Sequence, residues 1–360
     1  MKTLLKIVGA TLLLALLYLF FWPVPIDPVA WHAPEDRGLV DPYAPNDRLQ
    51  AATAIDLGHY EGPEDATLGY DNSVYLTTSG GRVLRIRNRK VEEFAVTEGR
   101  PLGIEAAIDG SLIVANAYAG LQRIDADGNV SNLLESVDGL APVYPNNLAL
   151  ADDGKIYFTE ASSKFGADKY RGTYNASLLD IMEHGSHGGV FEFDPEKGTA
   201  KMLLDDLNYA NGIAISDDNQ FLVIAETSNY RVLRYWLAGP RQGETDIVLE
   251  NLPGFPDNIK TGRSGRFWLG LAAPRNALLD RLANKPWLRK VVQRLPAAVR
   301  PRAVPSSHVI AFNGDGEILM NLQDPDARFP TLTGVLETQR SLYLTTLFGH
   351  EFPVIAKSDL

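Results

Sequence analysis

The segment DGKIYFTE (153–160) sets a pattern that recurs along the chain: an Asp- and Gly-rich turn, then a short run of β-branched and aromatic residues. Such a run, bounded by turn residues, is typical of a buried β-strand. Five further segments share it: DNSVYLTT (71–78), DGSLIVAN (109–116), DNQFLVIAE (218–226), SGRFWLG (264–270) and QRSLYLTT (339–346). The chain therefore contains six copies of one unit.

The spacing of the copies indicates the architecture. Their central residues are Tyr75, Ile113, Tyr157, Val223, Trp268 and Tyr343. Three of the separations are close to the ~40–50 residues of a four-stranded propeller blade, and the two longer ones indicate insertions. The sequence predicts an all-β fold, a six-bladed β-propeller over residues 49–360. A β-sandwich of unequal strands is the alternative.

Closure of the ring is predicted from the two ends of the propeller. The last unit has only about three strands, near 333–337, 341–346 and 352–356, before the sequence ends. An open blade would leave an unpaired strand edge. The segment AATAIDLG (51–58) precedes the first unit and is predicted to supply the missing fourth strand of the last blade.

The N-terminal region predicts a membrane anchor. The stretch IVGATLLLALLYLFFWPV (7–24) carries no charge and follows Lys2 and Lys6. About 20 apolar residues span a bilayer as a helix, and the preceding lysines stay cytoplasmic. We expect residues 1–24 to be a single-pass transmembrane signal-anchor with the propeller on the non-cytoplasmic side; a cleaved signal peptide is the alternative. Residues 25–48 are Pro-rich and are expected to form a stalk.

Composition excludes several classes of function. The 360 residues include 45 acidic and 34 basic side chains, for a net charge of −11. Such a chain repels phosphate backbones, so nucleic acid is not an expected partner. Cysteine is absent, which excludes disulfides, thiolate zinc sites and cysteine nucleophiles.

One register of the repeat carries oxygen-bearing side chains. The position 11 residues before each central residue is occupied by Glu64, Leu102, Asn146, Asn211, Asp257 and Leu332, once the extra turn residue of the fourth copy is allowed for. The inner strands of a propeller line its axis, so these positions converge on the central tunnel.

Four of these six residues predict a calcium site: Glu64, Asn146, Asn211 and Asp257. Two carboxylates and two amide oxygens suit calcium, whereas zinc and copper favour His or Cys ligands. The alternative is that each residue only forms a turn. The adjacent Asp65 and Asn258 are expected to support the ligands, because side chains alternate along a strand.

Three stretches resemble a known family: GRPLGIEAAIDGSLIVANAYAGL (99–121), LALADDGKIYFTEASSKF (148–165) and ENLPGFPDNIK (250–260). They are similar to the strictosidine synthase-like branch of the six-bladed calcium propellers, which are related to the paraoxonases and gluconolactonases. The resemblance implies arylesterase-type hydrolysis and calcium ligands at Glu64, Asn146, Asn211 and Asp257, with Asn258 as a candidate fifth.

The chain departs from these relatives at two points. The paraoxonases carry a catalytic His in the second blade, where this sequence has Leu102. No motif here matches the catalytic Glu of strictosidine synthases. The catalytic residues are therefore left unassigned.

The sequence thus predicts a membrane-anchored, calcium-dependent hydrolase of small esters or lactones, with the metal in the tunnel polarising the carbonyl. One alternative is a calcium-stabilised binding or scaffold propeller. A carbon–nitrogen condensing enzyme of the strictosidine synthase type is another.

Two insertions decorate the propeller. The first, 164–188, contains His184 and His187 and is expected near the tunnel mouth, which His350 could also approach. The second, 275–305, is rich in Arg and Lys and is predicted to form two short amphipathic helices around Lys285 and Pro286. It can cap the cavity or lie on anionic lipid, and the two roles are compatible.

Overall fold

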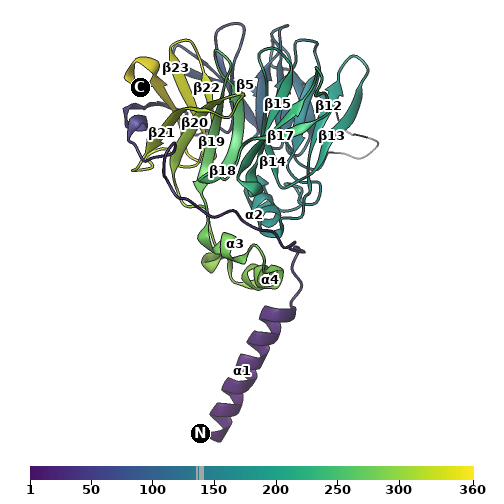
Figure 1. The fold of residues 1–360 in the computed structure, drawn as a ribbon, viewed down its shortest axis with the longest axis vertical. Coiled ribbons are helices and arrows are strands. Elements are labelled where there is room, and N and C mark those ends of the chain that lie inside the picture. The colour runs from purple at the N-terminus through teal and green to yellow at the C-terminus, as the bar shows by residue number, and fades with distance from the viewer. Residues whose placement is uncertain (135–136, 138–141) are drawn as a thin grey trace.

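The computed structural model describes residues 1–134, 137 and 142–360 and contains six four-stranded antiparallel sheets around a central axis (Figure 1). The predicted six-bladed propeller is confirmed.

The strands follow the chain blade by blade from the axis outward. Blade 1 holds β2 (Ala66–Leu68), β3 (Val74–Thr77), β4 (Arg82–Arg87) and β5 (Lys90–Val96), and blade 2 holds β6 (Pro101–Ala106), β7 (Leu112–Asn116), β8 (Gly120–Ile124) and β9 (Val130–Leu134). Blade 3 holds β10 (Pro145–Leu150), β11 (Ile156–Glu160), β12 (Gly188–Asp194) and β13 (Thr199–Leu207), and blade 4 holds β14 (Ala210–Ile215), β15 (Phe221–Glu226), β16 (Arg231–Trp236) and β17 (Thr245–Leu249). Blade 5 holds β18 (Gly254–Thr261), β19 (Arg266–Pro274), β20 (Ser307–Asn313) and β21 (Ile318–Asp324), and blade 6 holds β22 (Leu332–Glu337), β23 (Ser341–Thr346), β24 (Glu351–Ala356) and β1 (Thr53–Asp56).

The N-terminal strand closes the ring, as predicted. β1 pairs antiparallel with β24, with Thr53 opposite Val354 and Asp56 opposite Glu351. Ile55 of β1 is buried against the side of blade 1. Both ends of the propeller chain therefore meet in one sheet, and β1 pairs with the edge of β24 that would otherwise be open.

The second strand of each blade supplies the core. The residue that follows the repeat's central residue is fully buried in all six blades: Leu76, Val114, Phe158, Ile224, Leu269 and Leu344. The hydrophobic clusters join neighbouring blades; one, for example, combines Ile113 and Leu121 of blade 2 with Leu148 and Phe193 of blade 3. Packing between sheet faces therefore holds the ring together.

Helix α1 (Lys2–Phe21) projects from the propeller, and none of its residues is buried (Figure 1). Among the described helices, it is the one long and apolar enough to be a candidate membrane span.

Residues 23–48, which we call the strap, do not form the expected free stalk. They run from the end of α1 along the propeller to β21 (Figure 1). Ile26 is buried, Trp31 stacks on His184 with 4.0 Å between ring centroids, and Tyr43 lies edge-on to His308. Proline-rich composition indicates the absence of regular structure, but it does not exclude packing.

The insertion at 164–188 contains a helix that the sequence analysis missed. Helix α2 (Thr173–Glu183) follows Gly172, which offers no side-chain cap. Its apolar residues cover two faces: Leu179 and Met182 pack into the core, whereas Leu178 and Ile181 line a cavity. A helix that is apolar on both faces lacks the one-sided periodicity by which a surface helix is identified.

The second insertion forms the two predicted helices, α3 (Ala277–Leu282) and α4 (Pro286–Arg294), on either side of Lys285. Asn276 begins α3 by accepting hydrogen bonds from two backbone amides, and proline occupies the first position of α4. Short 3-10 turns complete the structure at η1 (Arg48–Ala51), η2 (Thr227–Asn229), η3 (Ala297–Val299) and η4 (Lys357–Asp359).

Candidate functional site

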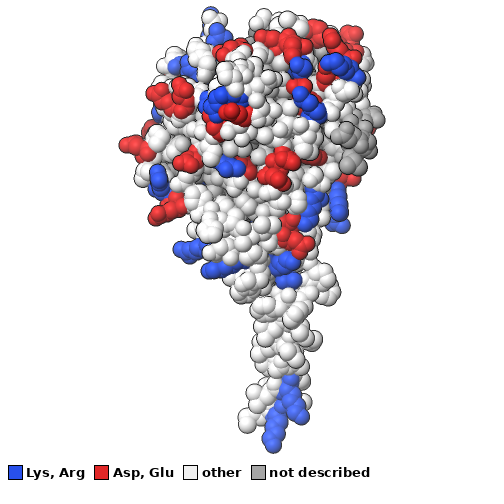
Figure 2. Space-filling view, turned by 45° about the vertical axis from the view of Figure 1, so that its right-hand side comes forward, with Lys and Arg blue, Asp and Glu red and all other residues white. Residues whose placement is uncertain are grey.

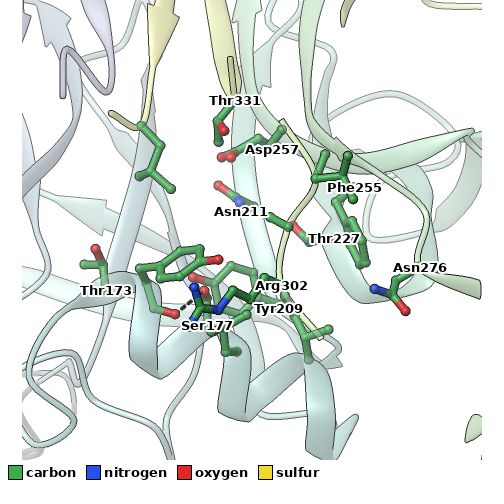
Figure 3. A pocket seen from close by; sticks show the side chains of 18 of the residues that line it. Thr173, Ser177, Tyr209, Asn211, Thr227, Phe255, Asp257, Asn276, Arg302 and Thr331 are labelled. Atoms are coloured by element: carbon green, nitrogen blue, oxygen red, sulfur yellow. Dashed lines mark hydrogen bonds between the residues drawn. The ribbon is translucent and has the colours of Figure 1, made fainter. Parts of the chain in front are cut away.

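One cavity lies between the propeller axis and the helices α2 and α3 (Figure 3). The structure brings all four predicted ligand residues to its lining: Glu64, Asn146, Asn211 and Asp257. They come from blades 1, 3, 4 and 5: Glu64 lies just before β2, and the other three lie in the first half of β10, β14 and β18. The register identified in the sequence therefore corresponds to one level of the tunnel.

β-Bulges occur at this level. The pairing of the inner strand with its neighbour shifts register between Pro145 and Leu148 in blade 3, and between Pro256 and Ile259 in blade 5; blade 4 shifts at the same position. A bulge places two residues opposite one and redirects their side chains. In blades 3 and 5 the consecutive polar pairs Asn146–Asn147 and Asp257–Asn258 are therefore placed at different depths of the tunnel.

The two carboxylates share a buried and electrostatically unfavourable environment. Burial raises the pKa of Glu64 and of Asp257, and the negative charge of Glu64 raises that of Asp257 further. Arg100 opposes this effect on Glu64 because its Nη2 donates a hydrogen bond to Oε2 over 2.9 Å. Two buried carboxylates with one guanidinium leave a net negative charge that a bound cation would neutralise.

Asn211 provides a separate indication of a ligand. Its Oδ1 is buried and has no hydrogen-bond donor among the described residues. An unsatisfied buried acceptor costs about 1–3 kcal/mol. Together with the nearby carboxylates and Asn146, it forms an oxygen donor set of the type that calcium uses. The residues present thus fit a calcium ion, and the described lining contains no His or Cys that would suit zinc.

A second polar layer lies directly beneath the four residues. Asn147 donates from Nδ2 to Oδ1 of Asn258, and Asn258 Nδ2 in turn donates to the carbonyl of Glu64, each over 2.9 Å. The carboxylate of Asp65 pairs with buried Lys260 at 2.9 Å. Asn258 therefore contacts the backbone of Glu64, whereas Asp65 is held by Lys260 and the Ile104 amide, and neither Asp65 nor Asn258 lines the cavity.

A third layer was missed in the sequence analysis. Tyr144, Tyr209 and Phe255 lie two residues before Asn146, Asn211 and Asp257, respectively, and all three line the cavity.

Tyr209 donates a hydrogen bond from its hydroxyl to that of Tyr144 over 2.8 Å, and burial raises the pKa of both phenols. They remain protonated at neutral pH. All three aromatic residues occupy one register, two residues before a polar position, so counting at that register would have found this layer.

The mouth of the cavity is built by both insertions. Helix α2 contributes Ser177 and Ile181, and the second insertion contributes Leu279 and Arg302. In Figure 3, Ser177 and Arg302 lie at the opposite end of the cavity from Asp257. The insertion at 275–305 therefore covers the cavity, which is one of the two roles expected for it.

The histidines lie outside this cavity. His184 is buried beneath Trp31, and burial together with the charge of Arg289 lowers its pKa to about 3. His187 is hydrogen-bonded to Glu183, and His350 is exposed beside the carbonyl of Tyr60. The expectation that a histidine approaches the site is thus not met by the described lining.

Known sequences match most of the chain. The family model for strictosidine synthase matches residues 146–240, and the model for the strictosidine synthase-like N-terminal region matches residues 41–86. Human adipocyte plasma membrane-associated protein is 33% identical over 346 residues, covering 89% of this chain and 81% of the relative. Strictosidine synthase-like 6 of Arabidopsis thaliana is 34% identical over 251 residues, covering 68% and 65%.

Solved structures share the fold at lower identity. A gluconolactonase of Xanthomonas campestris has a TM-score of 0.63 at 19% identity, covering 92% of this chain and 98% of that one. The calcium-binding protein regucalcin of Agrobacterium tumefaciens has a TM-score of 0.56 at 12% identity, covering 84% and 94%. The sequence matches, carried on this fold, show that the chain belongs to the strictosidine synthase-like family, together with the adipocyte plasma membrane-associated proteins.

Proposed function

We propose that the chain is a membrane-anchored, calcium-dependent hydrolase of small esters or lactones. Calcium would be held by Glu64, Asn146, Asn211 and Asp257. The observation that carries the proposal is the buried Asn211 oxygen without a donor among the described residues, beside two carboxylates at the base of a cavity. A scaffold protein has no need for oxygen ligands that face a cavity with room for a substrate.

The comparisons support this reaction class and the membrane location. Two proteins of the same fold are, by their names, a gluconolactonase and a calcium-binding protein. Helix α1 and the plasma-membrane association named for the animal relatives support an anchor. With Lys2 and Lys6 on the cytoplasmic side, the propeller lies on the other side of the membrane.

Different residues of the cavity would bind the metal and the substrate in such a reaction. When bound, calcium would act as a Lewis acid toward the substrate carbonyl. Leu102, Phe255 and Leu279 give the cavity apolar walls that bind the substrate and exclude water.

In this reaction Tyr144 would donate a proton and the carboxylates would accept one. Because Tyr209 donates to Tyr144, the Tyr144 hydroxyl keeps its own proton to donate to a substrate oxygen. Water is the nucleophile, and within the described lining the groups able to accept its proton are the carboxylates of Glu64 and Asp257.

The test uses the full chain in detergent and measures hydrolysis of aryl acetates and lactones after chelation and after calcium is restored. We expect chelation to abolish turnover and Asp257→Asn to lower it by roughly 100-fold or more. Asp315→Asn, the same change at an exposed turn of the same blade, is the matched control. Hydrolysis that survives both chelation and Asp257→Asn would contradict the proposal.

A further inference from the structure

The second insertion joins the cavity to the membrane helix. We call residues 275–304 the cap. On one side Leu279 and Arg302 line the cavity. On the other side Arg294 of α4 donates hydrogen bonds to the carbonyls of Leu19 and Trp22, at the end of α1. The cap is therefore a single element that contacts both the site and the candidate membrane span.

The contact with α1 fixes the depth of the cap. The Tyr18 hydroxyl donates to the carbonyl of Arg294 over 3.0 Å, and the ring of Phe20 stacks on Trp287 with 6.4 Å between centroids. Aromatic residues at the end of a membrane helix lie at the level of the lipid headgroups. Trp287 and α4 are held at the same level.

The outer surface of the cap combines exposed apolar and basic side chains. Trp287 is 57% exposed, and Leu278 is 46% exposed. Arg281 and Lys285 are exposed and form no ion pair among the described residues. In Figure 2, basic side chains gather where the apolar helix joins the propeller.

The charge of the cap contrasts with that of the whole chain. The cap contains six arginines and two lysines but one acidic residue, Asp280, whereas the chain carries a net charge of −11. Internal pairing uses only some of these charges, because Arg275 pairs with Asp280 and Lys290 pairs with Asp27.

We propose that the cap docks on anionic lipid headgroups of the bilayer that α1 enters, so that the cavity mouth opens at the membrane surface. Exposed aromatic and aliphatic residues bordered by arginine and lysine are typical of elements that lie in this interface. Continuity with α1 favours the bilayer over a protein partner. Docking of the cap on lipid does not depend on hydrolysis at the site.

The absence of cysteine allows a direct test. The full chain carrying Leu278→Cys is spin-labelled and placed, one copy per disc, in lipid nanodiscs with or without phosphatidylglycerol. Ile108→Cys is the matched control, because Ile108 is 87% exposed in the turn between β6 and β7, at the propeller face opposite the cap. In anionic discs we expect the label at 278 to collide several-fold less with a water-soluble nickel chelate than the label at 108. Equal collision rates would overturn the proposal.

A second arm tests the charge. Arg281→Gln with Lys285→Gln, in the Leu278→Cys background, should move the label toward water in anionic discs and leave it unchanged in neutral discs. The expected weakening of docking is roughly 5-fold for each charge removed. Lys90→Gln with Arg340→Gln removes the same charge from exposed sites on the opposite face. The proposal would be overturned if the two double substitutions moved the label equally. It would also be overturned if the label were protected only in discs that hold two copies of the chain.

Discussion

Glu64 and Asp257 place two carboxylates in a buried site where each disfavours ionisation of the other. Without a cation, this arrangement reduces the stability of the fold. The side chain of a turn-forming Asn or Asp hydrogen-bonds to nearby backbone groups. Asn211 differs, because its side-chain oxygen has no hydrogen-bond donor among the described residues. Turn formation alone therefore does not account for Asn211.

The first prediction is that Asp257→Asn affects thermal stability differently with and without calcium. In the presence of chelator, Asp257→Asn should match or exceed the melting temperature of the wild type, because the amide removes one of two like charges. In calcium the wild type should gain on the order of 4 kcal/mol at a thousandfold excess over Kd, and the variant should gain little. Thermal unfolding by circular dichroism measures both.

The control for this prediction is Leu102→Ala. Leu102 occupies the same register and is buried, so its truncation should cost about 2–5 kcal/mol with or without calcium while the calcium response remains. A calcium response of Asp257→Asn as large as that of the wild type would show that Asp257 is not a ligand.

The second prediction concerns pH. The folded-state pKa values of Glu64, Asp257 and Asp180 lie above their unfolded values, with Asp180 at about 7. Between the unfolded and the folded pKa, the folded state binds more protons than the unfolded state. The free energy of unfolding is therefore highest below the unfolded pKa and falls as pH rises through the folded pKa. Buried His184 and His308, whose pKa values are lowered to about 3 and about 4, add a smaller opposite slope that fades as unfolded histidine loses its proton. The three carboxyl groups outweigh it, so metal-free protein should become less stable from pH 6.5 to pH 8.

Urea unfolding at pH 6.5 and pH 8 measures this slope. Calcium should flatten it, because the ion favours the ionised form of Glu64 and Asp257, and Asp257→Asn should flatten it in the presence of chelator. A metal-free protein that gains stability across this interval would contradict the raised pKa values.

Part of this site could be predicted from sequence. The four oxygen-bearing residues share one register of a repeat, so counting along the chain was sufficient to bring them together. Arg100 was missed because its role depends on the geometry of one pair, the 2.9 Å contact with Glu64, which no spacing encodes. The layering of Asn146 above Asn147 depends on a bulge, which alternation alone does not predict.

At the scale of elements, the strands and the two helices of the second insertion followed from the pattern, whereas α2 and the packing of the strap did not. The six second strands are buried in every blade, so their composition is uniform and recognisable. Helix α2 contacts the core on one side and the cavity on the other, which removes its periodicity. The strap packs through isolated residues such as Ile26 and Trp31, whose spacing follows the propeller surface rather than a helix or strand.

The third prediction compares two truncations. Removing residues 1–48 deletes α1 and the strap, whereas removing residues 1–58 also deletes β1 and exposes the edge of β24. We expect the second truncation to lower the melting temperature far more than the first, and to promote aggregation through the unpaired edge. Equal melting temperatures would show that β1 does not close the ring.

At the scale of the whole molecule, charge and polarity are separated along one axis. The acidic propeller lies at one end, the apolar α1 with its terminal lysines at the other, and the basic cap between them (Figure 2). Because the cavity lies beneath the cap, the separation orients the proposed active site toward the membrane.

The last prediction tests whether the propeller depends on α1. Removing residues 1–22 should give a soluble, folded, β-rich domain, because the strap and β1 remain and, among the described residues, the side-chain contacts of α1 are with α4. Arg294 loses its backbone acceptors, so a modest destabilisation of about 1–3 kcal/mol is expected. Arg294→Gln in the full chain is the comparison, since it removes the same contacts while α1 remains. Circular dichroism, gel filtration and hydrolysis of a water-soluble ester measure the outcome. A truncated chain that aggregates while the full chain folds in detergent would show that α1 is part of the folded domain.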